Sequence, residues 1–253
     1  MRKACLVLLV LYGVWGKVHA AEETTQAELR VSRDSLGRDY ADWRSVEAQL
    51  LHRMQDGRAI YYGSLRETRR FSLDDQELFA GAYLPLPADW AAVVEGSTSP
   101  SHEVLARWSA FGQLQRKFAY GWNLQAGWRH TEYNNAGASL ASLTAERYWR
   151  NYRAAFTTYS GRLDGVGGTF PSGRMQFDYY YGDRDRIGFS LSAGREAENV
   201  GAAGVLVSKV RDAALAGSHW ISPQWAITYV VNVHRQGDIY TRHGIELGVR
   251  RRF

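Results

Sequence analysis

The sequence has little cysteine, little proline and few long apolar runs. Its 253 residues include one cysteine and five prolines. Outside the first twenty residues, no stretch holds enough consecutive apolar residues for a membrane-spanning helix, which excludes a helical membrane protein. Disorder is excluded as well, because 9 Trp, 15 Tyr and 9 Phe are more aromatic residues than a chain without a core carries. The mean hydropathy of -0.38 is typical of soluble proteins, but also of transmembrane β-barrels, whose apolar residues alternate with polar ones.

The N-terminal segment has the pattern of a secretory signal peptide. Met1-Arg2-Lys3 is a short basic start, Ala4–Trp15 is an apolar core, and Val18-His19-Ala20 resembles a cleavage site. As a helix this core would reach about 18 Å, too short for the ~30 Å hydrocarbon layer of a bilayer. We therefore predict a cleaved signal peptide over residues 1–20 and a single domain over residues 21–253.

Cleavage would change both the charge and the cysteine count. Arg2, Lys3 and Lys17 are three of the 31 basic residues, so the mature chain would carry 28 basic against 26 acidic residues, a net charge of +2. Such a small imbalance gives no support for nucleic acid as a partner. Cys5 would be removed too, so we expect no disulfide bond.

The dominant pattern of the remaining chain is alternation with a period of two. In Tyr120–Arg129 the even positions are apolar, and in Gln224–Gln236 the apolar residues fall on odd positions. Successive side chains of a strand point to opposite faces, so each such segment is a strand with one apolar and one polar face. The pattern predicts an all-β chain with strands near residues 25–33, 43–54, 58–70, 76–86, 89–98, 103–116, 119–132, 138–150, 152–163, 173–182, 185–195, 206–221, 223–236 and 239–253. The weak pattern of the first two strands and of 206–221 leaves twelve strands open as an alternative to fourteen.

Two all-β architectures fit this pattern, a secreted sandwich and a membrane barrel. Glycines lie on the polar faces, as the interior of a closed barrel requires. Aromatic residues gather near strand ends, where they suit two girdles at the membrane interfaces, although a sandwich would bury the same residues in its core. The glycines are Gly121, Gly127, Gly188, Gly194, Gly244 and Gly248, and the aromatic residues are Tyr61, Tyr62, Trp108, Tyr120, Trp122, Trp149, Tyr152, Trp220 and Trp225.

The C-terminal strand favours the barrel. In Ile239–Phe253 the terminal Phe253 is in phase with the apolar face. A final amphipathic strand that ends in Phe looks like the signal read by the assembly machinery of bacterial outer-membrane barrels. This strand must pair with the first one, because open sheet edges cannot face lipid. We predict a single antiparallel up-and-down transmembrane β-barrel of about 12–14 strands in the outer membrane of a Gram-negative bacterium, surrounded by lipids and lipopolysaccharide, with Phe253 as its assembly signal.

Spaced motifs along the chain resemble the YaiO-type family of outer-membrane β-barrels. They are Leu65–Phe71 with Asp74-Asp75, Ala80–Leu86, Gly121–Arg129, Glu146–Arg153 and Gly248–Phe253. The family pattern usually has an aromatic-proline pair near the start of the strand at 103–116, where this chain has Glu103-Val104-Leu105. The resemblance implies an outer-membrane location and, by analogy with some relatives, a function in the export of an envelope polysaccharide.

The side chains that could carry chemistry form no recognisable motif. The histidines after residue 20 show no metal-ligand spacing, so we predict no metal site and no cofactor. No GxSxG occurs, and no segment brings Ser, His and an orienting Asn or Asp into recognisable order, so no catalytic residue is predicted. Outer-membrane acyl hydrolases can nevertheless place Ser and His on adjacent strands, and an enzyme acting on lipid or lipopolysaccharide remains an alternative.

The charges on the polar faces are the more informative set. They are Arg66, Arg107, Arg129, Glu146, Arg150, Arg153, Arg174, Asp178, Arg242, Glu246 and Arg250. Glu146 and Arg150 lie four apart on one face of a strand, so their partners are expected on neighbouring strands. These groups either pair into a structural plug or line an aqueous path. The excess of arginine favours an anionic solute or polymer, and we expect passage or docking of a solute or envelope polysaccharide.

Overall fold

Strand pairing closes the chain into one barrel. The computed structural model describes residues 23–37, 40–55, 59–199 and 205–253, so the predicted signal peptide, residues 1–20, lies outside the described residues. The described strands are β1 (Thr24–Leu36), β2 (Trp43–Arg53), β3 (Ile60–Arg70), β4 (Leu73–Pro85), β5 (Trp90–Thr98), β6 (Trp108–Lys117), β7 (Trp122–Glu132), β8 (Gly137–Trp149), β9 (Tyr152–Leu163), β10 (Phe170–Tyr181), β11 (Asp185–Asn199), β12 (Val205–Trp220), β13 (Trp225–Gln236) and β14 (Tyr240–Arg252). One short 3-10 helix, Ala119–Gly121, joins β6 to β7.

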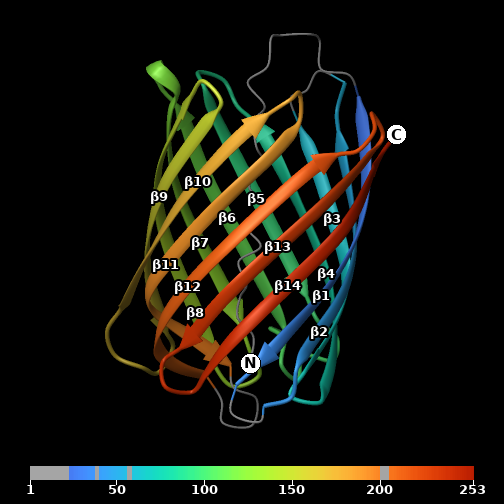
Figure 1. The fold of residues 1–253 in the computed structure, drawn as a ribbon. Helices are drawn as coiled ribbons and strands as arrows, with labels where there is room; N and C mark the ends of the chain where they lie inside the picture. The colour runs from blue at the N-terminus through green and yellow to red at the C-terminus, as the bar shows by residue number, and fades with distance from the viewer. Residues whose placement is uncertain (1–22, 38–39, 56–58, 200–204) are drawn as a thin grey trace.

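Each strand pairs antiparallel with its neighbours in sequence, and β14 pairs with β1 (Figure 1). In that closing pair Gln26 lies opposite Arg252 and Val31 opposite Leu247. The backbone groups of both terminal strands are thereby satisfied, which a barrel in lipid requires. The prediction of an up-and-down barrel is confirmed with fourteen strands, and the sandwich is excluded.

The two faces of the wall have opposite character. On β1, Leu29 and Val31 point outward and are 55% and 49% exposed, whereas Glu28 and Arg30 point inward and are buried. The other strands repeat this arrangement, since most of the large exposed side chains are apolar and the buried set is rich in charged and polar residues. An apolar exterior around a polar interior is the pattern of a barrel that sits in lipid.

Nearly every strand differs from its predicted bounds by at least one residue, and three of these differences change the wall. The strand predicted over 103–116 begins only at Trp108, because residues 99–107 form a loop. Gly121, expected on a strand face, lies instead in the 3-10 turn with a φ of 78°. In β11, pairing with β12 continues to Asn199, four residues beyond the predicted end at 195.

Most of the aromatic residues predicted to form girdles lie at outward-facing strand ends. Trp108, Trp122 and Trp225 are 40%, 43% and 40% exposed there. The Arg251 guanidinium lies 5.3 Å from the Trp225 ring and 4.7 Å from the ring of Phe253, so the charge stays at the rim. Tyr62 is different, because it is buried and its hydroxyl donates to Glu95 inside the barrel. Among the described residues no helix is long and apolar enough to cross a membrane.

Candidate functional site

The barrel interior contains two adjoining cavities. The larger one, of about 890 Å³, is lined from β1, β2 and β7 through β14, and the smaller one, of about 300 Å³, from β4 through β10. Both are lined by Arg129, Leu140, Tyr148, Arg150, Tyr159 and Gln176. The two cavities therefore adjoin at these six residues.

A buried chain of ion pairs crosses β8, β9, β10 and β11. The Arg153 guanidinium, only 2% exposed, donates to Glu146 at 2.7 Å and to Asp178 at 2.8 Å. Arg186 donates to the other oxygen of Asp178 at 2.9 Å, and Asn123 donates to Glu146 at 2.8 Å. Glu146 also accepts a hydrogen bond from Gln125 at 2.9 Å, so each carboxylate has at least two donor residues, which offsets the cost of placing charges inside the wall.

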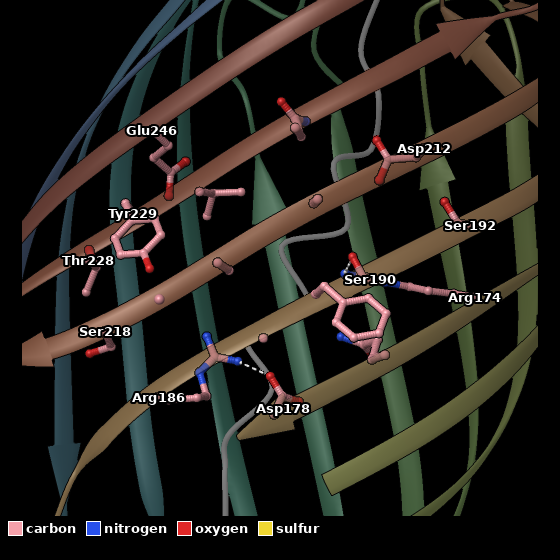
Figure 2. A pocket seen from close by; sticks show the side chains of 18 of the residues that line it. Arg174, Asp178, Arg186, Ser190, Ser192, Asp212, Ser218, Thr228, Tyr229 and Glu246 are labelled. Atoms are coloured by element: carbon pink, nitrogen blue, oxygen red, sulfur yellow. Dashed lines mark hydrogen bonds and ion pairs between the residues drawn. The ribbon is translucent and has the colours of Figure 1, made fainter. Parts of the chain in front are cut away.

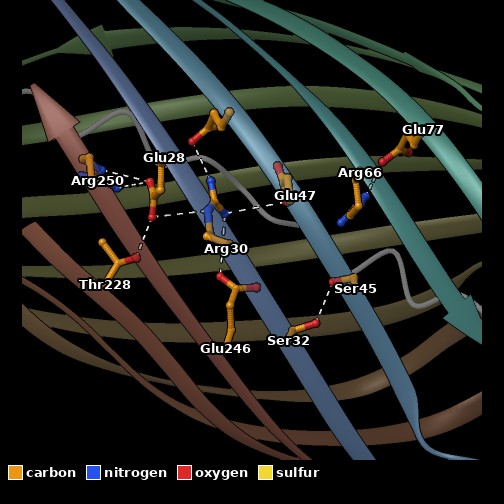
Figure 3. Close-up of polar contacts among 11 residues, drawn as sticks. Glu28, Arg30, Ser32, Ser45, Glu47, Arg66, Glu77, Thr228, Glu246 and Arg250 are labelled. Carbon is orange, nitrogen blue, oxygen red and sulfur yellow. Dashed lines mark hydrogen bonds and ion pairs between the residues drawn. The ribbon is translucent and has the colours of Figure 1, made fainter. Parts of the chain in front are cut away.

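A second cluster joins the first and last strands (Figure 3). Glu28 on β1 accepts hydrogen bonds from Arg250 on β14 at 2.7 Å and from Thr228 on β13 at 2.6 Å. Arg30 donates to Gln49 on β2 at 2.6 Å and lies 3.8 Å from Glu246 on β14. These contacts tie together the strands whose pairing closes the barrel.

A glycine makes room for that cluster. Gly248 faces the lumen between β1 and β13, and a Cβ there would lie 2.8 Å from Arg30 Cγ and 2.9 Å from Glu28 Oε1, besides colliding with Thr228. Real Cβ atoms do not approach other atoms so closely, so the charged side chains fill the space that the glycine leaves.

A third cluster lies on the opposite wall. Glu95 on β5 accepts hydrogen bonds from Arg129 on β7 at 2.7 Å and from Tyr62 on β3 at 3.0 Å. The Arg129 guanidinium also lies 4.7 Å from the ring centre of Phe111 on β6. The position of Arg129 beside both cavities is therefore fixed from three strands.

The end of the barrel opposite the start of β1 and the end of β14 is partly filled by a loop. Residues 99–107, between β5 and β6, lie over the inward-facing Asp75 of β4. The Asp75 carboxylate accepts hydrogen bonds from the backbone N–H groups of Glu103 at 3.0 Å, Val104 at 2.7 Å and Leu105 at 2.6 Å. Val104 and Leu105 are fully buried. Because Asp75 faces inward and these two side chains are fully buried, the loop folds into the opening on its side.

Apolar side chains cover the neighbouring part of the same end. Leu36, Trp43 and Tyr240 form a buried cluster from β1, β2 and β14. Arg70 and Arg242 lie 4.5 and 5.1 Å from the Trp43 ring, and Arg242 lies 3.3 Å from Asp34. Side chains fill this corner. The larger cavity lies mainly along the wall from β8 to β13, which we call the open side.

That open side carries a row of polar groups (Figure 2). Arg174 on β10 donates to Ser190 on β11 at 3.2 Å, and Asp212 on β12 lies 3.4 Å from His234 on β13. The larger cavity is lined by nine arginines and seven acidic residues. Its wall is polar, mixed in sign and weakly positive.

The predicted lumen residues fall into several groups. Glu146 and Asp178 meet at Arg153, Arg66 pairs with Glu77, Arg129 with Glu95, Arg242 with Asp34, and Glu246 with Arg30. Each of these partners lies on a different strand, as the strand geometry predicts. Arg150 lies in the turn after β8 and lines both cavities, whereas Arg107 is exposed at the end of the loop before β6. Phe253, 64% exposed, follows β14, and its backbone N–H donates to Thr25 at 2.9 Å.

Several central residues were missing from the sequence-based set. Glu28 and Arg30 lie on a strand whose pattern was weak, and Glu95 and Asp75 were not assigned to a face. The alternation of Glu28 and Arg30 with the apolar Leu29 and Val31 could have assigned both charges to the inner face. No sequence pattern indicates that Asp75 would bind the backbone of a loop 28 residues away.

Comparisons with known proteins agree with this architecture. The family model of the YaiO membrane beta barrel domain matches residues 24–199, which is more than half of the chain and ends before the motif at 248–253. No curated protein matches the sequence. The CymD monoaromatic hydrocarbon channel is 8% identical with a TM-score of 0.57, covering 91% of this chain and 88% of its own. The outer membrane protein Omp33 of Acinetobacter baumannii is 10% identical with a TM-score of 0.51, covering 91% and 99%. A KdgM porin is 11% identical with a TM-score of 0.49, covering 88% and 98%. At these identities the likeness concerns the fold alone.

Proposed function

The chain belongs to the YaiO family of membrane β-barrels, and we propose that it is a passage for small hydrophilic solutes, with a preference for anions, across the outer membrane of a Gram-negative bacterium. The observation that carries this proposal is the pair of adjoining lumen cavities, which are lined by polar and charged side chains from nearly every strand. A wall of this kind can replace part of the hydration of a solute along the cavities.

The preference for anions follows from the charges at the cavities. Arginines outnumber acidic residues at the larger cavity, and the smaller one is lined by Lys117, Arg129, Arg150 and Arg153 against Glu95 and Glu146. A weak positive potential in a narrow aqueous path attracts anions. An acidic envelope polysaccharide would meet the same potential, and its passage or docking is the narrower form of the proposal.

The proposal includes an orientation in the membrane. β1 begins and β14 ends at the same end of the barrel, the upper one in Figure 1, and we place that end in the periplasm. Lipids and lipopolysaccharide would contact the apolar outer wall. The assembly machinery would bind the last strand through Phe253, which is exposed at the rim.

Planar-bilayer conductance tests the proposal. Purified protein should give conductance steps with an anion/cation permeability ratio above one, and Arg174→Gln should move that ratio toward one. Arg174 is a better probe than Arg129, because neutralising Arg129 would leave Glu95 buried without its guanidinium partner.

Arg211→Gln is the matched control. It removes the same charge from an exposed, outward-facing position of β12, so ion selectivity should stay at the wild-type value. Absence of conductance at any voltage would contradict the proposal and favour a plugged structural barrel. An equal effect of both substitutions would contradict the anion path along Arg174.

A further inference from the structure

On the outer wall, strand pairing brings together a serine, a histidine and a glutamate. His130 on β7 lies directly opposite Ser139 on β8, and the Ser139 Oγ is 3.0 Å from His130 Nδ1. The other ring nitrogen, Nε2, lies 3.4 Å from the carboxylate of Glu132. A hydroxyl on one imidazole nitrogen and a carboxylate on the other is the arrangement that activates a serine nucleophile.

These three side chains lie on the outer face of the wall, and the residue Ser139 also borders the larger cavity. On β7 the inward positions are odd, as Asn123 and Arg129 show, so His130 and Glu132 point outward. The imidazole lies 5.2 Å from the ring of Trp108 and stacks at 5.9 Å on Trp128, both exposed on the outer wall. The group sits at the last residues of β7 and the first of β8, where the apolar wall meets water.

The neighbouring positions complete the site. Arg162 on β9 lies opposite Ser139 on its other side, faces outward and is exposed. Gly137 lies opposite Glu132, and a Cβ there would collide with Asp164 Oδ2 and lie 3.1 Å from Glu132 Oε2, so the glycine leaves room for both carboxylates. Toward the middle of the wall, Trp128 and Leu143 are 52% and 63% exposed and offer an apolar path for acyl chains.

We propose that Ser139, His130 and Glu132 form an acyl-ester hydrolase site for lipids of the leaflet at this rim. The carboxylic ester is the shared chemistry of phospholipids and of the acylated sugar lipid of lipopolysaccharide. In the orientation proposed above, this rim meets the outer leaflet. The site is separate from the lumen, and solute passage is not needed for it.

The reaction proceeds through an acyl-enzyme. Ser139 Oγ attacks the ester carbonyl carbon while its proton moves to His130, and the negative oxygen that forms is stabilised by the Arg162 guanidinium. The carbon–oxygen bond to the lipid alcohol then breaks, and His130 gives its proton to that alcohol. Water attacks the acyl-Ser139 ester with His130 as base, which releases the fatty acid and restores Ser139. Ser139 and His130 are the catalytic residues, and Glu132 positions the imidazole.

The test measures fatty-acid release from mixed micelles of diacyl phosphatidylethanolamine and, separately, of lipopolysaccharide. Wild-type protein should release fatty acid from at least one of the two substrates, and the substrate that is hydrolysed identifies the class of lipid. Ser139→Ala should lose the activity to background, and His130→Gln should lose at least about 100-fold. Glu132→Gln should lower kcat with little change in KM. A fluorophosphonate probe should form one adduct, located at Ser139.

Ser160→Ala is the matched control. Like Ser139, Ser160 faces outward, but it lies on β9. Its partner on β8 is Ala141, so no histidine lies opposite it there. This variant should keep wild-type activity and labelling, and heat-modifiable gel mobility verifies the folding of every variant. If the wild-type protein releases no more fatty acid than Ser139→Ala and the probe does not label Ser139, the contacts are only a structural hydrogen-bond chain and the proposal is wrong. Conductance is measured on the same preparations, so failure of this site leaves the solute-passage proposal unaffected.

Discussion

Replacing Arg153 by methionine gives the most direct test of how the lumen charges stabilise the barrel. Methionine keeps much of the side-chain volume but removes the guanidinium that joins Glu146 to Asp178 at 2.7 and 2.8 Å. Both carboxylates are nearly inaccessible to solvent, with side chains 4% and 5% exposed. The variant therefore leaves two buried acids without the donor they share.

The size of the effect follows from the donors that remain. Removing one partner of a buried ion pair costs about 3–5 kcal/mol. Glu146 keeps hydrogen bonds from Asn123 at 2.8 Å and Gln125 at 2.9 Å, and Asp178 keeps Arg186 at 2.9 Å. We therefore expect a loss of about 3 kcal/mol in the free energy of unfolding, at the lower end of that range.

Urea unfolding of protein inserted in phospholipid vesicles, followed by tryptophan fluorescence, measures this loss. Arg153→Met combined with Glu146→Gln should regain part of the stability, because Glu146 is then no longer a buried charge without its guanidinium, while Asp178 keeps its ion pair with Arg186.

Arg33→Met is the surface control. It breaks the exposed pair between Arg33 of β1 and Asp42, which lies between β1 and β2. The hydrogen bond from Arg33 holds the pKa of the Asp42 carboxyl below its usual value. An exposed pair of this kind has little effect on stability. Equal unfolding midpoints for Arg153→Met and Arg33→Met would refute the reasoning.

Two further predictions concern the inner loop and the strand closure. Asp75→Ala removes the acceptor of three backbone N–H groups. Residues 99–107 should therefore become sensitive to protease, and the single-channel conductance should rise. Unchanged protection of the loop would show that other contacts hold it. Gly248→Ala places a methyl group among Thr228, Arg30 and Glu28 and should cost about 1–3 kcal/mol in urea unfolding. Gly112→Ala, where a Cβ has no atom within 4 Å, should be nearly neutral, and equal losses for the two alanines would contradict this packing argument.

Much of the wall could be predicted from residues close in sequence. The alternation in Tyr120–Arg129 assigns Asn123 and Arg129 to the inner face and Trp122 and Trp128 to the outer face without knowledge of any neighbour. Phe253 in phase with the apolar residues of the last strand indicated a closed barrel, and β14 does pair with β1. The errors fall where tertiary contacts outweigh local pattern. Residues 103–107 read as strand, but the backbone N–H groups of Glu103, Val104 and Leu105 bind the carboxylate of Asp75 in place of a neighbouring strand.

The sequence by itself determined the class of protein, because a side-chain period of two is a local property of extended backbone and a polar face needs a lumen to occupy. The partners of the charged residues were decided only by the tertiary structure, since they depend on register between strands. Glu28 meets Arg250 across 222 residues, and Ser139 meets His130 because β7 and β8 pair at that position. A shift of one residue in either register would turn these side chains to opposite faces, so both candidate sites depend on the register between paired strands.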